Sequence, residues 1–399
     1  MARRQLPPQI KKIELDRKEN GKQVVRYQLT VDVGNDPVTG KRKQFRKRYA
    51  KLADAEDKLS SLQADVAKGA HAHASSLTVE QACAQWLAGR RIRPSTLAAY
   101  THSLQPLRDV HGSLLVRKLT KLHLDELVAG LMAGTIPKPD DTPRRKWKAT
   151  SINPMLATLG RMMDDLVKQG SLVRNVAELV DRVPKEHVEM QTFTEAEVRR
   201  LLAAAAADRN EHAWHLALSG LRRGEICGLR WSDVDLKKGT LQVSNNRVSV
   251  NGKPSEGAPK SDRSGRTLPL TPALKDALKR ARKRQAEEKL ALGEAYDAGI
   301  HVVCDPAGQP FHPDTISDYW RSMCKTAKVS EIRLHDARHT CGTLMHLQGV
   351  PIVVIAAWLG HADAAFTMRT YMHSQDDALK DAAASWDRVV TTRDNSGSG

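Results

Sequence analysis

The residues best suited to chemistry lie in the stretch from Leu334 to His373. Within the run LHDARHT, His335 and Arg338 are three positions apart, so they share one face of a helix. An imidazole and a guanidinium brought together in this way can bind one small anion. The spacing therefore predicts a phosphate-binding pair on a helix.

A second element must place further side chains beside this pair. Pro351 opens the run IVVIAAWL, and Gly360 closes it as a helix C-cap would. The run is apolar on every face, which predicts a buried helix with His361 held rigidly at its end. Beyond it, Asp363 is a candidate N-cap for a last helix that carries Tyr371.

Composition narrows the class of protein. The 399 residues exceed one ordinary core and suggest about two to three domains. No stretch approaches the roughly 20 apolar residues of a membrane span, and the start MARRQLPPQIKK lacks the apolar core of a secretory signal. We therefore expect a soluble protein in the cytoplasm, with no membrane partner.

Cysteine content indicates the state of the thiols, and the net charge indicates the kind of partner. The five cysteines are scattered and contain no CxxC, so we expect free, mostly buried thiols rather than disulfides or a thiolate metal site. A net charge of +17 and a pI near 9.7 indicate a polyanion. Because aromatic residues are only 4% of the chain, base stacking on single strands is disfavoured and double-stranded DNA fits better.

Residues 1–50 are the most basic segment, with fourteen Lys or Arg against five Asp or Glu. Residues 24–33 and 41–49 predict two strands joined by a turn, and residues 53–68 predict an amphipathic helix behind them. A basic face of this hairpin would bind the DNA major groove, with Lys41, Lys43, Arg46 and either Arg48 or Lys47 on that face. The candidate DNA-binding residues are Lys41, Arg42, Lys43, Arg46, Lys47 and Arg48. The alternative is a solvated basic edge that prevents strand aggregation.

The middle of the chain predicts an all-α unit. Thr78 and Gln81 form a capping box ahead of a helix. Further helices are expected from Pro94 through Leu107, over residues 121–131 and over residues 151–169. The Pro-rich, charged residues 137–148 predict a surface loop that touches phosphates.

A third unit begins at a second capping box, Thr194 to Glu197. Strands are expected over residues 240–250 and 266–270, and a long basic helix over residues 273–292. The Gly-, Pro- and Ser-rich connection between the two strands predicts a mobile loop.

Five motifs in register now support a resemblance. In chain order they are LSGLRRGEICGLRW, PKSDRSGRTLPL, LHDARHT, WLGHADAAF and TYMH. Together they resemble the tyrosine recombinases, the phage integrase family. The resemblance implies three domains: a small α+β hairpin-plus-helix domain that binds arm sites (residues 1–70), an all-α core-binding domain (77–182), and a mainly α catalytic domain with a small antiparallel sheet (190–390).

The chemistry agrees with this resemblance. Cleavage of a phosphodiester builds negative charge on its nonbridging oxygens, and positive donors placed there stabilise it. Arg222 and Arg338 would clamp the scissile phosphate, and His335 and His361 would add hydrogen bonds. The motifs contain no paired carboxylates for two metal ions, so we expect neither a metal nor a cofactor.

Tyr371 would then be the nucleophile. A phenol has a pKa of about 10, so it needs a cationic pocket and a base, for which His335 is the candidate. The 5′-hydroxyl that leaves needs a proton donor. The resemblance implies Lys260 for that role, although Lys253 lies in the same loop and is an alternative.

Other assignments of these residues remain open. Arg222 could form an ordinary salt bridge with Glu225. His335 and His339 are four apart and could ligate zinc, although HDARH is not the HExxH pattern. His361 could be a helix-end cap.

The resemblance also implies the assembly. Residues 376–390 carry a helical apolar stripe that includes Trp386, and we expect it to dock on a neighbouring protomer. The expected partners are core and arm attachment sites, a homotetramer on DNA, a DNA-bending host factor and an excision factor. The expected function is site-specific integration, and also excision, of a phage or mobile element in the nucleoid of a bacterial host. The alternatives are a type IB topoisomerase-like enzyme and a catalytically silent DNA-binding regulator.

Overall fold

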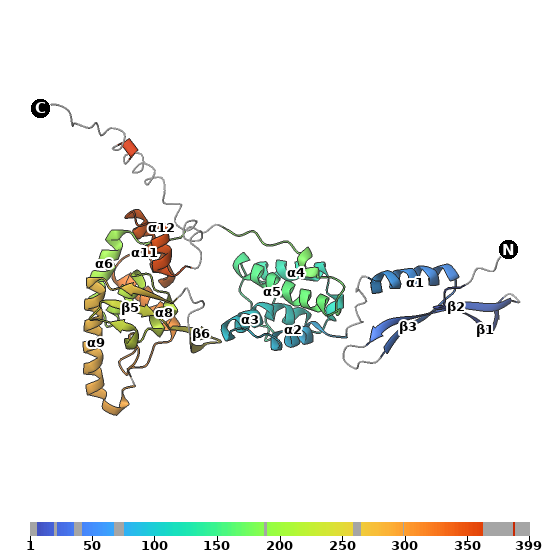
Figure 1. Ribbon diagram of the computed structural model, residues 1–399, viewed down its shortest axis with the longest axis horizontal. Coiled ribbons are helices and arrows are strands. Elements are labelled where there is room, and N and C mark those ends of the chain that lie inside the picture. The colour runs from blue at the N-terminus through green and yellow to red at the C-terminus, as the bar shows by residue number, and fades with distance from the viewer. Residues whose placement is uncertain are drawn as a thin grey trace. The chain divides into compact units, whose positions relative to one another are not determined.

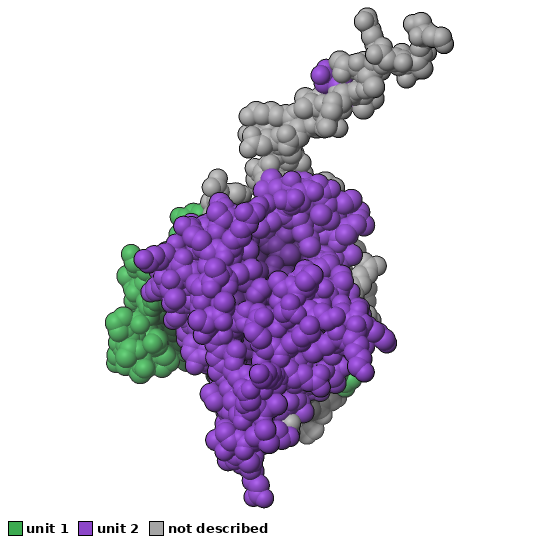
Figure 2. All heavy atoms as spheres, turned by 90° about the vertical axis from the view of Figure 1, so that its left-hand side faces the viewer, with its two compact units in different colours: residues 1–187 green, residues 188–399 purple. Residues whose placement is uncertain are grey.

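Two units divide the chain in the computed structural model, residues 1–187 and residues 188–399, and Figure 2 shows them in different colours. The structure describes residues 6–19, 22–35, 42–67, 76–186, 190–257, 265–297, 299–361 and 386–387. Within the first unit, the N-terminal sheet and the helices that follow it have separate hydrophobic clusters. The limits of the three predicted domains stay a prediction.

The N-terminal sheet has three antiparallel strands, in the order β1 (Ile10–Glu19), β2 (Lys22–Asn35) and β3 (Arg42–Tyr49). The helix α1 (Leu52–Ala67) packs its apolar side chains on one face of the sheet (Figure 1). The predicted hairpin and helix are confirmed, but β1 was missed. Its sequence is dominated by charged residues, because this edge strand buries only Ile10 among its described side chains.

The helical part, as described over residues 76–186, contains four α-helices. They are α2 (Val79–Ala88), α3 (Pro94–His111), α4 (Lys121–Ala133) and α5 (Ala149–Lys168), with short 3-10 turns at Val116–Lys118 and Val176–Leu179. The capping box at Thr78 is present as predicted, with Gln81 at the third helical position. Residues 137–148 form neither helix nor strand, also as predicted. The helix α5 supplies much of the core, so the other helices assemble around it.

The second unit is mainly helical. Its helices are α6 (Glu195–Ala205), α7 (Glu211–Leu218), α8 (Arg223–Gly228), α9 (Pro272–Leu292), α10 (Pro313–Thr326), α11 (Leu334–Leu347) and α12 (Ile352–Leu359), with 3-10 turns at Trp231–Asp233 and Gly293–Ala295. The capping box at Thr194 and the long basic helix α9 are confirmed. No motif had indicated α10, whose Trp320 packs in the core against Trp214 and Phe193.

The described residues of this unit form two small antiparallel sheets. The first has the order β4 (Val234–Asp235), β5 (Thr240–Val243), β8 (Arg266–Pro269), and the second pairs β6 (Asn246–Val250) with β7 (Lys253–Gly257). The predicted single strand over residues 240–250 is therefore wrong. Ser244 and Asn245 donate hydrogen bonds to Asp233, at 2.6 and 3.2 Å, and so end β5 before β6 begins. Residues 253–257, predicted as loop, form β7.

The helix α12 is only half buried, so the prediction of a buried helix is wrong. Ile355, Ala356 and Leu359 are buried on one side. On the other side Val353 and Val354 are 71% and 51% exposed among the described residues. Because α12 is short and packs mainly on α11, only the face toward α11 is buried. The opposite face stays exposed although its residues are also apolar.

All five cysteines are free and buried, as predicted. Burial raises the pKa of both Cys83 and Cys227 to about 12, so these thiols stay protonated. Among the helices of the described residues, none has the length and apolar character needed to cross a bilayer.

Candidate active site

Arg222 is placed by a sharp turn between α7 and α8. Gly220 adopts a φ of 90°, which turns the chain so that Arg222 becomes the N-cap residue of α8. The backbone N–H of Arg222 donates to Glu225 Oε2 at 2.9 Å, and its Nη1 donates to Oε1 at 2.7 Å. The salt bridge considered from the sequence therefore exists, yet a third of the Arg222 side chain is still exposed, 33%.

Arg338 lies on α11, the helix predicted from LHDARHT, and is only 1% exposed. Its Nη1 donates to the carbonyl oxygen of Gly220 at 2.6 Å, and its Nη2 donates to that of Leu359. A buried cation needs such partners to offset its lost hydration. Arg338 thus connects α11 to the turn before Arg222 and to the end of α12.

The C-terminal end of α12 is the centre of the arrangement. Three arginines donate to three successive carbonyl oxygens that the helix itself leaves unpaired. The pairs are Arg266 Nε with Trp358 at 2.7 Å, Arg338 with Leu359, and Arg222 Nη2 with Gly360 at 3.0 Å. Cations are favoured at this end of a helix, where the helix dipole is negative. The guanidinium groups of Arg222 and Arg338 are therefore held at adjacent peptide units.

His361 follows this helix end. Gly360 has a left-handed φ of 63°, as the predicted C-cap requires, and the N–H of His361 donates to the carbonyl of Ala356 at 2.9 Å. Burial lowers the pKa of His361 to about 4, with a further contribution from Arg338 and Arg222. His361 is consequently a neutral imidazole near pH 7.

His335 is also held in its neutral form. Burial is the largest cause that lowers the pKa of His335, and the positive charge of Arg338 is the next. The ring of His339 meets it edge to face, with 4.9 Å between centroids. Nδ1 of His339 is buried and has no hydrogen-bond partner among the described residues.

Groups of three or more His, Cys, Asp or Glu side chains that could hold a metal ion do not occur in the described part of the chain.

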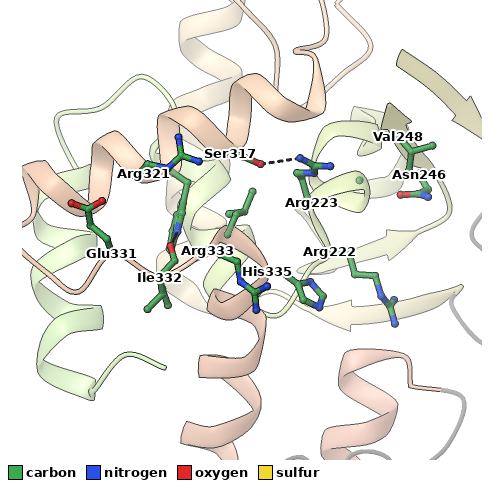
Figure 3. Close-up of a pocket in the computed structure, with 13 residues that line it drawn as sticks. Arg222, Arg223, Asn246, Val248, Ser317, Arg321, Glu331, Ile332, Arg333 and His335 are labelled. Carbon is green, nitrogen blue, oxygen red and sulfur yellow. Dashed lines mark hydrogen bonds between the residues drawn. The ribbon is translucent and has the colours of Figure 1, made fainter. Parts of the chain in front are cut away.

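A pocket of about 580 Å³ is lined by two of the candidate catalytic residues, Arg222 and His335. Figure 3 shows His335 and several guanidinium groups around it. Its charged lining residues are Arg222, Arg223, Arg321, Arg333 and Glu331. Cations outnumber the single carboxylate in the lining, so the pocket suits a ligand that carries phosphate.

Two of the six predicted catalytic residues, Lys260 and Tyr371, lie outside the described residues. Of the other four, Arg222, Arg338 and His361 meet at the end of α12, and His335 lines a pocket together with Arg222. Lys253, the alternative to Lys260, is an exposed residue of β7. Arg266 was named only as the start of a strand, and no sequence signal linked it to its partner Glu225, 41 residues away.

The basic residues of the N-terminal sheet are described in part. Lys41 lies outside the described residues, and Arg42 and Lys43 are placed in β3 without a described side chain. The side chains of Arg46, Lys47 and Arg48 are exposed. Strand alternation puts Arg46 and Arg48 on the face opposite Phe45 and Tyr49, which pack toward α1. Lys47 lies over the Tyr49 ring, 5.5 Å from its centroid, so Arg48, not Lys47, shares the face of Arg46.

Comparison with known proteins gives independent evidence on the family to which the second unit is related. Residues 191–378 match the model of the phage integrase family. The chain is 29% identical to a XerC-like tyrosine recombinase of Caldanaerobacter subterraneus subsp. tengcongensis over 52% of its own length and 58% of that protein. It is 24% identical to the ICEBs1 integrase of Bacillus subtilis, over 93% of its own length and 98% of that protein.

Solved structures show the same fold. The Tn1549 transposon integrase in complex with a circular intermediate DNA matches with a TM-score of 0.64 and 16% identity, over 78% of this chain and 100% of that one. The lambda integrase tetramer bound to a Holliday junction matches with a TM-score of 0.55 and 19% identity, over 92% and 96%. Residues 191–378 of the chain therefore carry a domain of the phage integrase family, and its relatives in sequence include tyrosine recombinases and integrases.

Proposed function

We propose that the chain is a site-specific DNA recombinase that cuts and rejoins duplex DNA through a 3′-phosphotyrosine intermediate. The observation that carries the proposal is that Arg222, Arg338 and His361 meet at the end of α12, while His335 lines a pocket with Arg222 and is acted on by the charges of both arginines. Two fixed guanidinium groups beside two neutral imidazoles suit a phosphodiester in its transition state.

The two arginines would bind the nonbridging oxygens of the scissile phosphate. Both are anchored before substrate arrives, so little reorganisation accompanies the build-up of charge on those oxygens. Each guanidinium has five N–H groups in a fork that matches phosphate oxygens. Among the described residues, the hydrogen bonds of the Arg222 guanidinium group engage Nη1 and Nη2, which is only part of that set.

The neutral histidines would serve proton transfer and hydrogen bonding. An imidazole that is already protonated cannot accept the phenol proton, so the lowered pKa of His335 favours its role as base for Tyr371. The phenol oxygen forms the new bond to phosphorus, and the bond from phosphorus to the 5′ oxygen breaks. Lys260 would give that oxygen its proton. A second 5′-hydroxyl then attacks the phosphotyrosine, so the strand is resealed without ATP.

The proposed assembly has four protomers on DNA. Its support is the likeness to lambda integrase, which has been solved as a tetramer on a Holliday junction. We propose core and arm attachment sites as the DNA partners, with a DNA-bending host factor and an excision factor, in a bacterial cell. The basic β3 strand, with exposed Arg46 and Arg48, would bind the arm sites.

A nicked duplex of the cognate core site tests the proposal, because the nick lets the free fragment leave and traps the cleaved product. Wild-type protein should give a covalent protein–DNA band on a denaturing gel, and Tyr371→Phe should bind the site but give none. If both proteins bind and neither forms the band, the catalytic assignment fails and a silent DNA-binding regulator is the better account. Relaxation of supercoiled DNA by a monomer without paired sites would instead support the topoisomerase-like alternative.

A further inference from the structure

Glu225 is the common partner of two arginines at the proposed active site. It is 3% exposed and accepts from the backbone N–H and Nη1 of Arg222. Arg266 also donates to it, from Nη1 to Oε1 at 3.2 Å and from Nη2 to Oε2 at 3.0 Å. Both carboxylate oxygens are thus shared between the two guanidinium groups.

Arg266 itself is placed to act on the protein, because all three nitrogens of its guanidinium group donate to protein oxygens. Its side chain is 7% exposed, against 33% for Arg222. Its Nε donates to the carbonyl of Trp358 at 2.7 Å. A side chain Cβ added at Gly360 would lie 3.0 Å from Arg266 Nη1, so the end of α12 packs directly on this guanidinium.

The charges of these three residues explain why a second arginine is needed. A buried carboxylate with Arg222 as its single cationic partner would offset most of the charge that Arg222 offers a phosphate. With Arg266 present, Glu225 is shared and the trio carries a net positive charge. Burial raises the pKa of Glu225, but hydrogen bonding and charge from Arg266, and then from Arg222, outweigh burial and hold it below its usual value. Glu225 is therefore ionised and must be balanced.

We infer that Arg266 is a positioning residue that takes up the charge of Glu225 and so leaves Arg222 an effective cation for the scissile phosphate. It also fixes the C-terminal end of α12, and His361 lies directly after the C-cap residue of that helix. This inference rests on the proposed function, because it concerns how strongly Arg222 acts on DNA phosphate.

A compensating pair of substitutions tests it. Arg266→Met should slow formation of the covalent complex on the nicked core site by about a hundredfold, the lower end of what loss of one oxyanion donor costs. Adding Glu225→Gln removes the unbalanced charge, so the double variant should recover to within about tenfold of wild type. Arg266→Lys keeps the charge and should retain more activity than Arg266→Met. A double variant that folds but cleaves no better than Arg266→Met would overturn the inference. If Arg266→Met does not fold, the double variant is compared with wild type, and a folded double variant that stays more than about tenfold slower would overturn it.

A neutral substrate separates charge from mere structure. A methylphosphonate at the scissile position lacks one charged nonbridging oxygen and depends less on Arg222. On this substrate the deficit of Arg266→Met relative to wild type should shrink to about tenfold or less, whereas a structural defect would slow both substrates equally. If wild-type protein itself forms no covalent band, the proposed function has failed; if it does and the deficit is the same on both substrates, only the role of Arg266 has failed.

Discussion

Gly220→Ala is the substitution whose effect follows most directly from the geometry around the candidate active site. Gly220 has a φ of 90°, a conformation that L side chains rarely adopt. An added Cβ would lie 2.7 Å from Leu359 Cδ2 and 3.3 Å from Cys341 Sγ. Both neighbours are buried, so neither can move freely into solvent. Leu359 also carries the carbonyl to which Arg338 donates.

Two contributions set the magnitude. A left-handed conformation costs a residue with a Cβ about 1–2 kcal/mol. Overpacking of a filled core costs about 1–3 kcal/mol more. The free energy of unfolding of the second unit should therefore fall by about 2–5 kcal/mol, a large part of the roughly 5–15 kcal/mol typical of a domain. Cleavage should fall as well, because Leu359 must shift.

Native-state hydrogen exchange of core amides in α7 and α11 would measure the loss, since it reads the second unit separately from the first. Gly239→Ala is the matched control in the same unit. Gly239 has a φ of 69° and no heavy atom within 4 Å of an added Cβ, so it should lose only the backbone contribution of about 1–2 kcal/mol.

Equal losses in the two variants would refute the reasoning, because the contact with Leu359 would then contribute nothing. Normal cleavage by a Gly220→Ala protein that is destabilised as expected would show that the end of α12 can move without harm to Arg338.

Three further outcomes are expected. Burial lowers the pKa of both His212 and His339 to about 4; between pH 6.5 and 4 the unfolded chain binds protons that the folded chain does not. Stability should therefore be complete above pH 6.5 and fall by about 1.4 kcal/mol per pH unit per histidine down to pH 4, in urea titrations across that range. Asn153 exchanges two hydrogen bonds with the backbone of Val183, at 2.9 and 3.0 Å, so Asn153→Ala should destabilise the first unit by about 1–3 kcal/mol in the same titration. Deletion of the residues after His373 should lower recombination far more than gel-shift binding to one core site, and equal losses would contradict a role in assembly.

Local signals in the sequence predicted most of the helices. The capping boxes at Thr78 and Thr194 and the C-cap at Gly360 each satisfy backbone groups within a few residues, so neighbours along the chain are enough to specify them. The strand boundaries were harder. The end of β5 depends on hydrogen bonds to Asp233, eleven residues from Ser244, which no alternation of side chains reveals.

The sequence by itself determined which side chains could act on a phosphate, because residue type and motif order are local and one-dimensional. Only the tertiary structure decided how they are held. Arg338 turns inward to two carbonyl oxygens, Glu225 is shared by Arg222 and Arg266, and half of α12 stays exposed. Each of these depends on contacts between segments far apart in the chain, where burial and charge balance, rather than spacing, set the outcome.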